Sequence, residues 1–228
     1  MNIDIIKAQD RGRTHIEWLD SWHTFSFGGY YNPKRIHFGA IRVINDDIID
    51  PGQGFDLHPH DNMEIVTIVL SGELEHKDSL GNGGILKPGD VQAMSAGTGL
   101  YHSERNPSRT TPVHLLQIWV MPNQKNLTPR YQDSQFAWTP NGWTQVVGSE
   151  PSEDRLWIHQ NCRFYLGQFE AGTRVVLPAG NAHLVMPIEG EIKLDYVVLA
   201  EADTALVKEA GDTQLEALKP SRVLVMVQ

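Results

Sequence analysis

Two short histidine motifs are the part of this 228-residue sequence with the clearest capacity for chemistry. In the first, His58 and His60 stand two residues apart and Glu64 follows four residues later; in the second, His102 stands two residues before Glu104. Side chains two residues apart in a β-strand point to the same face. Each motif can therefore aim a pair of ligands into one cavity. Two strands together would supply four ligands to a divalent transition metal.

Three neutral imidazoles and one carboxylate leave one or two positions open on a five- or six-coordinate ion, which is typical of a catalytic rather than a structural site. Such a set suits Fe(II), Mn, Co, Ni, Cu or Zn, and affinity alone does not select among them. We expect Fe(II). The identity of the carboxylate stays open at this point, because strand periodicity also counts Glu64 onto the face of His58 and His60.

The remaining candidate residues favour ordinary roles. His76 has no ligand partner two residues away, so a supporting or surface role is expected rather than metal binding. His183 is expected to pack or to hydrogen-bond. The lone cysteine, Cys162, excludes an internal disulfide and a cysteine-cluster zinc site, and nothing around it suggests a reactive thiol. The aromatic stretch from Trp18 to Phe27 is more typical of a core than of a pocket.

The elements that must position the histidines read as short strands separated by turns rich in Gly, Pro, Asn and Asp. Strands are predicted at Phe38–Ile44, Glu64–Leu70, Val113–Met121, Phe164–Phe169, Tyr196–Leu199 and Val223–Val227. This spacing indicates an all-β antiparallel sandwich or barrel rather than βαβ units.

When the sequence is aligned with itself at an offset of 118 residues, residues 64–74 align with residues 182–192. Both segments end in Gly-Glu followed by an aliphatic residue. Each half also has a lysine-containing turn that closes in Gly-Asp, at Gly89-Asp90 and at Gly211-Asp212. We interpret this as a degenerate repeat of one β domain. The predicted domains are residues 1–140, which bind metal, and residues 141–228, in which Val176, Pro178 and Ala182 replace the ligands and no metal is expected.

Composition narrows the function classes. With 40% hydrophobic and 21% charged residues, the chain is expected to fold as a globular protein. A net charge of -9 disfavours nucleic acid and anionic membranes as partners. The amino terminus lacks the apolar segment of a secretory signal, and no apolar run reaches the ~18 residues of a membrane helix. We therefore expect a cytoplasmic protein, and a monomer, because a repeat already supplies two packed domains.

Several motifs, concentrated in residues 3 to 135, resemble those of the pirin family in the cupin superfamily, in particular its bacterial quercetinase-like members. They are Leu19-Asp20-Ser21-Trp22-His23-Thr24-Phe25-Ser26-Phe27, His58-Pro59-His60, Glu73-Leu74-Glu75-His76-Lys77-Asp78-Ser79, Pro88-Gly89-Asp90-Val91-Gln92 and His102-Ser103-Glu104. Two positions depart from the general cupin pattern: Gly72 lies one residue farther from Glu64 than usual, and Gly97 stands where many cupins have proline.

The resemblance implies a bicupin, two β-sandwich or jelly-roll barrels, whose amino-terminal barrel holds a metal ion on His58, His60, His102 and Glu104. It favours Glu104 over Glu64, because the pirin carboxylate follows the third histidine by two residues. It also implies a quercetin 2,3-dioxygenase, which cleaves a flavonol with O2. The flavonol would bind the metal through its 3-hydroxyl, and Glu104 would take the proton. Substrate-binding residues are not identified.

Two other functions remain open in the sequence. One is a metal-binding, redox-sensing regulator that acts through protein partners, as the transcription-cofactor members of the pirin family suggest. The other is a cupin without redox chemistry, such as a sugar isomerase.

Overall fold

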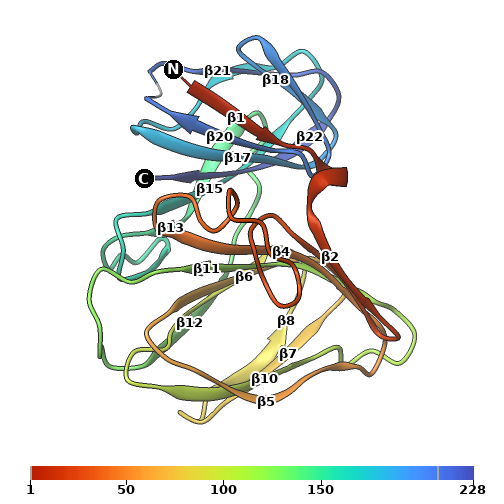
Figure 1. The fold of residues 1–228 in the computed structure, drawn as a ribbon, viewed down its shortest axis with the longest axis vertical. Coiled ribbons are helices and arrows are strands. Elements are labelled where there is room, and N and C mark those ends of the chain that lie inside the picture. The colour runs from red at the N-terminus through yellow and green to blue at the C-terminus, as the bar shows by residue number, and fades with distance from the viewer. Residues whose placement is uncertain (1, 210) are drawn as a thin grey trace. The chain divides into compact units, whose positions relative to one another are not determined.

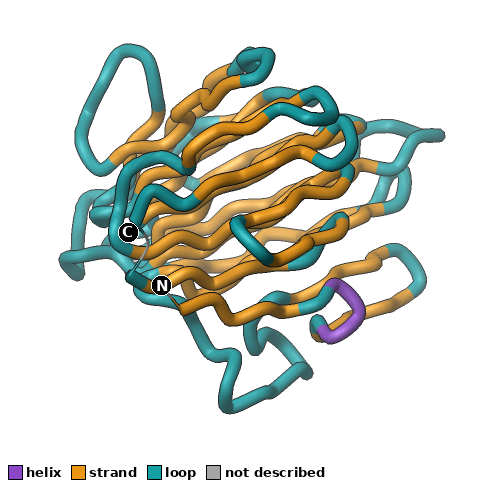
Figure 2. The backbone as a smooth tube through the Cα atoms, turned by 90° about the horizontal axis from the view of Figure 1, so that it is seen from above, coloured by secondary structure: helices purple, strands orange, loops and turns teal. Residues whose placement is uncertain are grey.

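A computed structural model describes residues 2–209 and 211–228 of the chain. Within these ranges nearly all regular structure is β, and the single helix is a short 3-10 turn, η1 (Ala8–Asp10) (Figure 2). No helix in the described ranges has the length and apolar character needed to span a bilayer. The expected all-β class is confirmed.

The chain folds into two compact units, and neither is continuous in sequence. The histidine unit comprises Gly12–Phe136 and Ser149–Gln160, and the C-terminal unit comprises Met1–Arg11, Ala137–Gly148 and Asn161–Gln228. The first strand joins the C-terminal unit because it pairs with a strand late in the sequence. The division into two continuous domains, residues 1–140 and 141–228, stays a prediction, because the compact units are made of separate segments of the chain.

The histidine unit contains two antiparallel sheets (Figure 1). The larger sheet has the order β12-β9-β6-β11-β4-β3-β2 and the smaller has the order β5-β10-β7-β8. The strands are β2 (Gly12–Ile16), β3 (Leu19–His23), β4 (Ile41–Ile49), β5 (Gly54–His60), β6 (Glu64–Ser71), β7 (Leu74–Asp78), β8 (Gly83–Leu86), β9 (Asp90–Ser95), β10 (Leu100–Arg105), β11 (Val113–Val120) and β12 (Arg130–Gln135). The short strand β14 (Leu156–Trp157) also belongs to this unit.

The C-terminal unit repeats the two-sheet plan. One sheet contains the order β1-β20-β17-β22-β15-β13 and the other β16-β21-β18-β19. The strands are β1 (Asn2–Ile6), β13 (Gly142–Gly148), β15 (Arg163–Phe169), β16 (Arg174–Val176), β17 (Ala182–Glu189), β18 (Glu191–Leu194), β19 (Val197–Ala200), β20 (Thr204–Lys208), β21 (Gln214–Ala217) and β22 (Ser221–Val227). Two such units in one chain make the predicted bicupin.

Each unit closes around its own apolar core. In the histidine unit, side chains from the larger sheet such as Leu19 and Val69 pack against Leu74 and Leu86 of the smaller sheet. In the C-terminal unit, the core includes Leu215 and Ala217 on the inward positions of β21. Burial of these apolar faces drives the pairing of the sheets.

The six predicted strands all overlap observed strands, and the first of them differs most in its bounds. The segment expected from Phe38 begins as a strand only at Ile41, because Phe38 and Ile41 close a tight turn and Gly39 takes a positive φ of 54°. The core face of the neighbouring β11 follows the expected apolar pattern and is almost fully buried.

The two units repeat the same strand pairing, but the Gly-Asp turns that the sequence aligned are not equivalent in the structure. β9 pairs with β6 as β20 pairs with β17, so the counterpart of Gly89-Asp90 is Ala202-Asp203. Both turns have a positive φ before the aspartate, and each aspartate accepts a hydrogen bond from the backbone N–H three residues earlier, at 2.7 Å and 3.1 Å. The predicted counterpart, Gly211-Asp212, lies after β20.

The backbone conformation at position 97 explains why glycine stands there in place of the proline of many cupins. Its φ is 50°, which a proline cannot adopt, and a Cβ there would overlap the Leu127 carbonyl group. We expect Gly97→Ala to lower the free energy of unfolding by roughly 3 kcal/mol or more, through backbone strain plus overlap. Gly81→Ala is the matched control, because its φ is 90° and its surroundings are open. It should cost about 1 kcal/mol. Equal losses in urea denaturation would contradict the steric argument.

Candidate metal centre and its cavity

The antiparallel pairing of β5 and β10 brings the predicted ligands together. His58 lies directly opposite His102, and His60 lies opposite Leu100. A bulge between His102 and Glu104 shifts the register, so that Glu104 lies opposite Phe55. His58, His60 and His102 form a group whose ligand atoms lie within 4.8 Å of one another. The alternation that the sequence suggests therefore does converge three imidazoles.

Glu104 joins the same cluster through His102. A second group with ligand atoms within 4.8 Å of one another contains His76, His102 and Glu104. The imidazole rings of His58 and His102 are the closest pair, with centroids 4.4 Å apart. His102 thus belongs to both groups, and Glu104 is grouped with His76 and His102 rather than with His58 and His60.

Burial favours the neutral form of two of these imidazoles, His60 and His102. It lowers the pKa of His60 to about 4 and, reinforced by the neighbouring histidines, lowers the pKa of His102 to about 2. Burial also raises the pKa of Glu104 to about 7. Metal binding requires the neutral form of imidazole, so His60 and His102 need not lose a proton at neutral pH before they bind a cation.

Unpaired buried atoms provide a test of whether a cation fits. His102 Nε2 and Glu104 Oε1 are buried and have no hydrogen-bond partner among the described residues. His58 Nδ1 lies 2.7 Å from the backbone carbonyl of Asp56, which leaves its Nε2 for a ligand role. Buried polar atoms almost always have partners. A divalent ion held by these groups would supply the missing interactions, so the residues fit such an ion.

Gln117 and Thr67 orient the carboxylate. Gln117 Nε2 donates to Glu104 Oε2 at 2.9 Å, and Thr67 Oγ1 donates to Gln117 Oε1 at 3.1 Å. The bond from Thr67 fixes which end of the Gln117 amide faces Glu104. One carboxylate oxygen is therefore tied and the other, Oε1, is left without a partner among the described residues. Sequence reasoning missed Gln117, although it is the polar residue in the otherwise apolar centre of β11.

His76 packs against the imidazole of His102, with ring centroids 5.3 Å apart. It is fully buried, stacks on Tyr131 with centroids 4.8 Å apart, and has its Nδ1 3.5 Å from His102 Nδ1. It comes from β7, directly opposite Glu104. Its Nε2 also lies 3.6 Å from Oδ2 of the buried Asp78, two residues along the same strand, a neighbour that the sequence argument did not consider.

Glu64 lies outside the cluster. Its Oε2 accepts a hydrogen bond from Ser95 Oγ at 2.7 Å and from the backbone N–H of His159 at 3.2 Å. The count that placed it beside His60 crosses a turn at residues 61–63, where Asn62 has a positive φ of 46°. The turn leads from the smaller sheet to the larger one, so strand periodicity does not carry across it.

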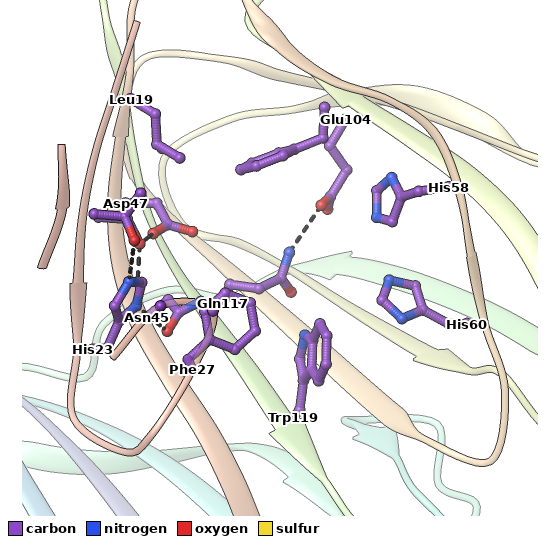
Figure 3. A pocket seen from close by; sticks show the side chains of 15 residues that line it. Leu19, His23, Phe27, Asn45, Asp47, His58, His60, Glu104, Gln117 and Trp119 are labelled. Carbon is purple, nitrogen blue, oxygen red and sulfur yellow. Dashed lines mark hydrogen bonds between the residues drawn. The ribbon is translucent and has the colours of Figure 1, made fainter. Parts of the chain in front are cut away.

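The cluster opens on a cavity of about 390 Å³. Figure 3 shows His58 and His60 on one side of it and Asp47, His23 and Asn45 on the other. Apolar side chains complete the walls, namely Leu19, Phe27, Phe55 and Trp119. Part of the aromatic stretch assigned to the core thus lines the cavity, while Phe25 is buried as expected.

Two predictions about other residues agree with the structure. His183 is buried, with its Nε2 2.7 Å from the carbonyl oxygen of Pro178. Cys162 is buried too, and burial raises the pKa of its thiol to about 12, which leaves it unreactive at neutral pH.

Asp47 is a buried carboxylate on the wall that faces the histidines. Burial raises its pKa from 3.8 to about 7, against the lowering effect of a hydrogen bond from Ser21. The folded chain therefore binds this proton more tightly than the unfolded chain, so stability is lost as pH rises from about 4 to about 7.

Asp47→Asn should remove that loss. We expect the variant to be more stable than the wild type by an amount that grows between pH 4 and 7 and then levels off at a few kcal/mol. Urea denaturation of both metal-free proteins across this range measures the difference. A difference that shrinks as pH rises would show that Asp47 is stabilised as a carboxylate.

Comparisons with known proteins cover both units. The family described as Pirin matches residues 6–120, and the family described as quercetinase C-terminal cupin domain matches residues 145–226. The chain is 40% identical over 221 residues to the quercetin 2,3-dioxygenase of Escherichia coli (strain K12), covering 96% of this chain and 95% of the relative. It is also 40% identical over 228 residues to a putative quercetin 2,3-dioxygenase of Mycobacterium tuberculosis (strain ATCC 25618 / H37Rv), covering 98% and 93%.

Solved structures agree. YhhW from Escherichia coli superposes with a TM-score of 0.95 at 39% identity, covering 99% of this chain and 97% of that chain. The bacterial pirin YhhW in complex with nickel(II) gives a TM-score of 0.94 at 40% identity, covering 99% and 98%. With a family match over more than half its length and relatives of this similarity, the chain belongs to the pirin family of bicupins.

Proposed function

We propose that the protein is a metal-dependent dioxygenase that cleaves a flavonol such as quercetin with O2. The observation that carries the proposal is the pair of buried atoms without partners in the described residues, His102 Nε2 and Glu104 Oε1, beside two more imidazoles at a cavity with apolar walls. The names of the relatives support the reaction, and the nickel complex of YhhW supports a divalent ion.

His58, His60, His102 and Glu104 would hold the ion. When bound, a divalent metal would favour the deprotonated form of a coordinated hydroxyl group, such as the flavonol 3-hydroxyl. We expect Fe(II), with Mn, Co, Ni, Cu and Zn as the other candidates.

The chain itself supplies binding and proton transfer. Leu19, Phe27 and Trp119 offer apolar surface to aromatic rings and exclude water around them. The Glu104 carboxylate accepts the 3-hydroxyl proton, and the hydrogen bond from Gln117 to Oε2 holds it in place. A buried carboxyl group with a pKa raised to about 7 is suited to this role at neutral pH.

Glu104→Gln should retain metal on the three histidines and lose turnover of quercetin by about 100-fold or more, because the amide cannot accept the proton. Bound metal is measured by elemental analysis and turnover by loss of flavonol absorbance. Glu75→Gln is the control, since this side chain is partly exposed and pairs with Lys77 at 2.8 Å. An unchanged rate in Glu104→Gln would remove Glu104 from proton transfer.

The enzyme is distinguished from a regulator or a sugar isomerase by loading the purified protein anaerobically with single metals and then adding quercetin and O2. We expect metal-dependent bleaching together with release of carbon monoxide. Bleaching that is equal without metal would reflect autoxidation of the flavonol. Tight metal binding without turnover would favour the regulatory function.

A further inference from the structure

The wall that faces the histidines carries a hydrogen-bonded polar cluster from three strands. Asp47 and Asn45 lie on β4, Ser21 and His23 on β3, and Thr14 on β2. All five line the cavity, and Asp47, His23 and Asn45 are visible on the left of Figure 3. None of them has a part in the proposed metal centre.

Hydrogen bonds within this cluster use the hydroxyl protons of Ser21 and Thr14 and the ring proton of His23. Ser21 Oγ donates its proton to Asp47 Oδ1. His23 Nδ1 faces Asn45 Oδ1 at 2.8 Å, so this nitrogen carries the ring proton, and Thr14 Oγ1 donates to Nε2 at 2.8 Å. The Asp47 carboxylate, held in one orientation by Ser21, is a charged acceptor on this wall of the cavity.

A structural role does not account for a carboxylate at this position. Asp47 is 3% exposed and shares its surroundings with apolar cavity walls, where an ionised group is costly to keep. An uncharged side chain could also accept the bond from Ser21. Groups that lower stability and face a cavity are typical of functional sites.

We propose that Asp47 recognises the substrate, accepting a hydrogen bond from a phenolic hydroxyl group at the end of the flavonol away from the metal. The inference rests on the proposed function, which places a flavonol in the cavity. It specifies the substrate class further. The cavity takes flavonols with hydroxyl groups besides that at position 3, and it disfavours anionic aromatic compounds, because both Asp47 and Glu104 face the ligand.

The test compares two probes, quercetin and 3-hydroxyflavone, which lacks every hydroxyl group except that at position 3. Asp47→Asn keeps the size of the side chain and removes its charge. Asp46→Asn is the matched control, because this neighbouring carboxylate pairs with His114 Nε2 at 2.6 Å and does not line the cavity. Binding is measured anaerobically by calorimetry on the metal-loaded proteins, and turnover is measured separately with O2.

In the wild type, we expect quercetin to bind more tightly than 3-hydroxyflavone. In Asp47→Asn, quercetin should bind about tenfold more weakly, as expected for loss of a hydrogen bond to a charged group, while 3-hydroxyflavone should change little. Asp46→Asn should bind both probes as the wild type does. Equal effects of Asp47→Asn on both probes, or no effect on either, would overturn the proposal.

Anaerobic binding separates this inference from the proposed function. Selective weakening of quercetin binding without any turnover would support recognition by Asp47 and contradict the dioxygenase. Turnover of both flavonols without any selectivity at Asp47 would support the dioxygenase and contradict the inference. Melting curves of each variant exclude misfolding as the cause, and Asp47→Ala gives a second variant that lacks both carboxylate oxygens.

Discussion

The antiparallel pairing of β5 with β10 is the constraint on which the candidate centre depends. It sets His58 opposite His102 and turns both imidazoles into the barrel. A slip of one residue in this register would turn the side chains of the slipped strand to the other face, and the alternating buried residues of β10 oppose such a slip. The bulge after His102 then redirects Glu104, which a regular ladder would not place opposite Phe55.

The same burial that prepares the site for a cation makes it unfavourable without one. His102 Nε2 and Glu104 Oε1 lack partners in the described part of the chain, and the buried Asp47 carboxylate adds a further cost. The apolar cores of the two units offset these costs. Binding of an ion to the folded chain alone would add stability in proportion to the logarithm of its concentration over the dissociation constant.

Strand alternation predicted the convergence of His58, His60 and His102, because it is a local property of each strand. It failed for Glu64, because a positive φ at Asn62 separates that residue from β5. It also did not identify Gln117 and Asp47, which line the cavity from strands distant in sequence from the histidine motifs. Only the pairing order of the sheets brings those residues together, and spacing along the chain carries no record of it.

The central claim is that three imidazoles and Glu104 hold one divalent ion at the cavity. A crystal structure of the protein loaded with Co(II), with anomalous scattering measured at the cobalt edge, tests it most directly. The account predicts one cobalt peak per chain, within bonding distance of His58, His60, His102 and Glu104. A peak on His76 in place of His58 and His60, or no peak at these residues in protein saturated with Co(II), would contradict it.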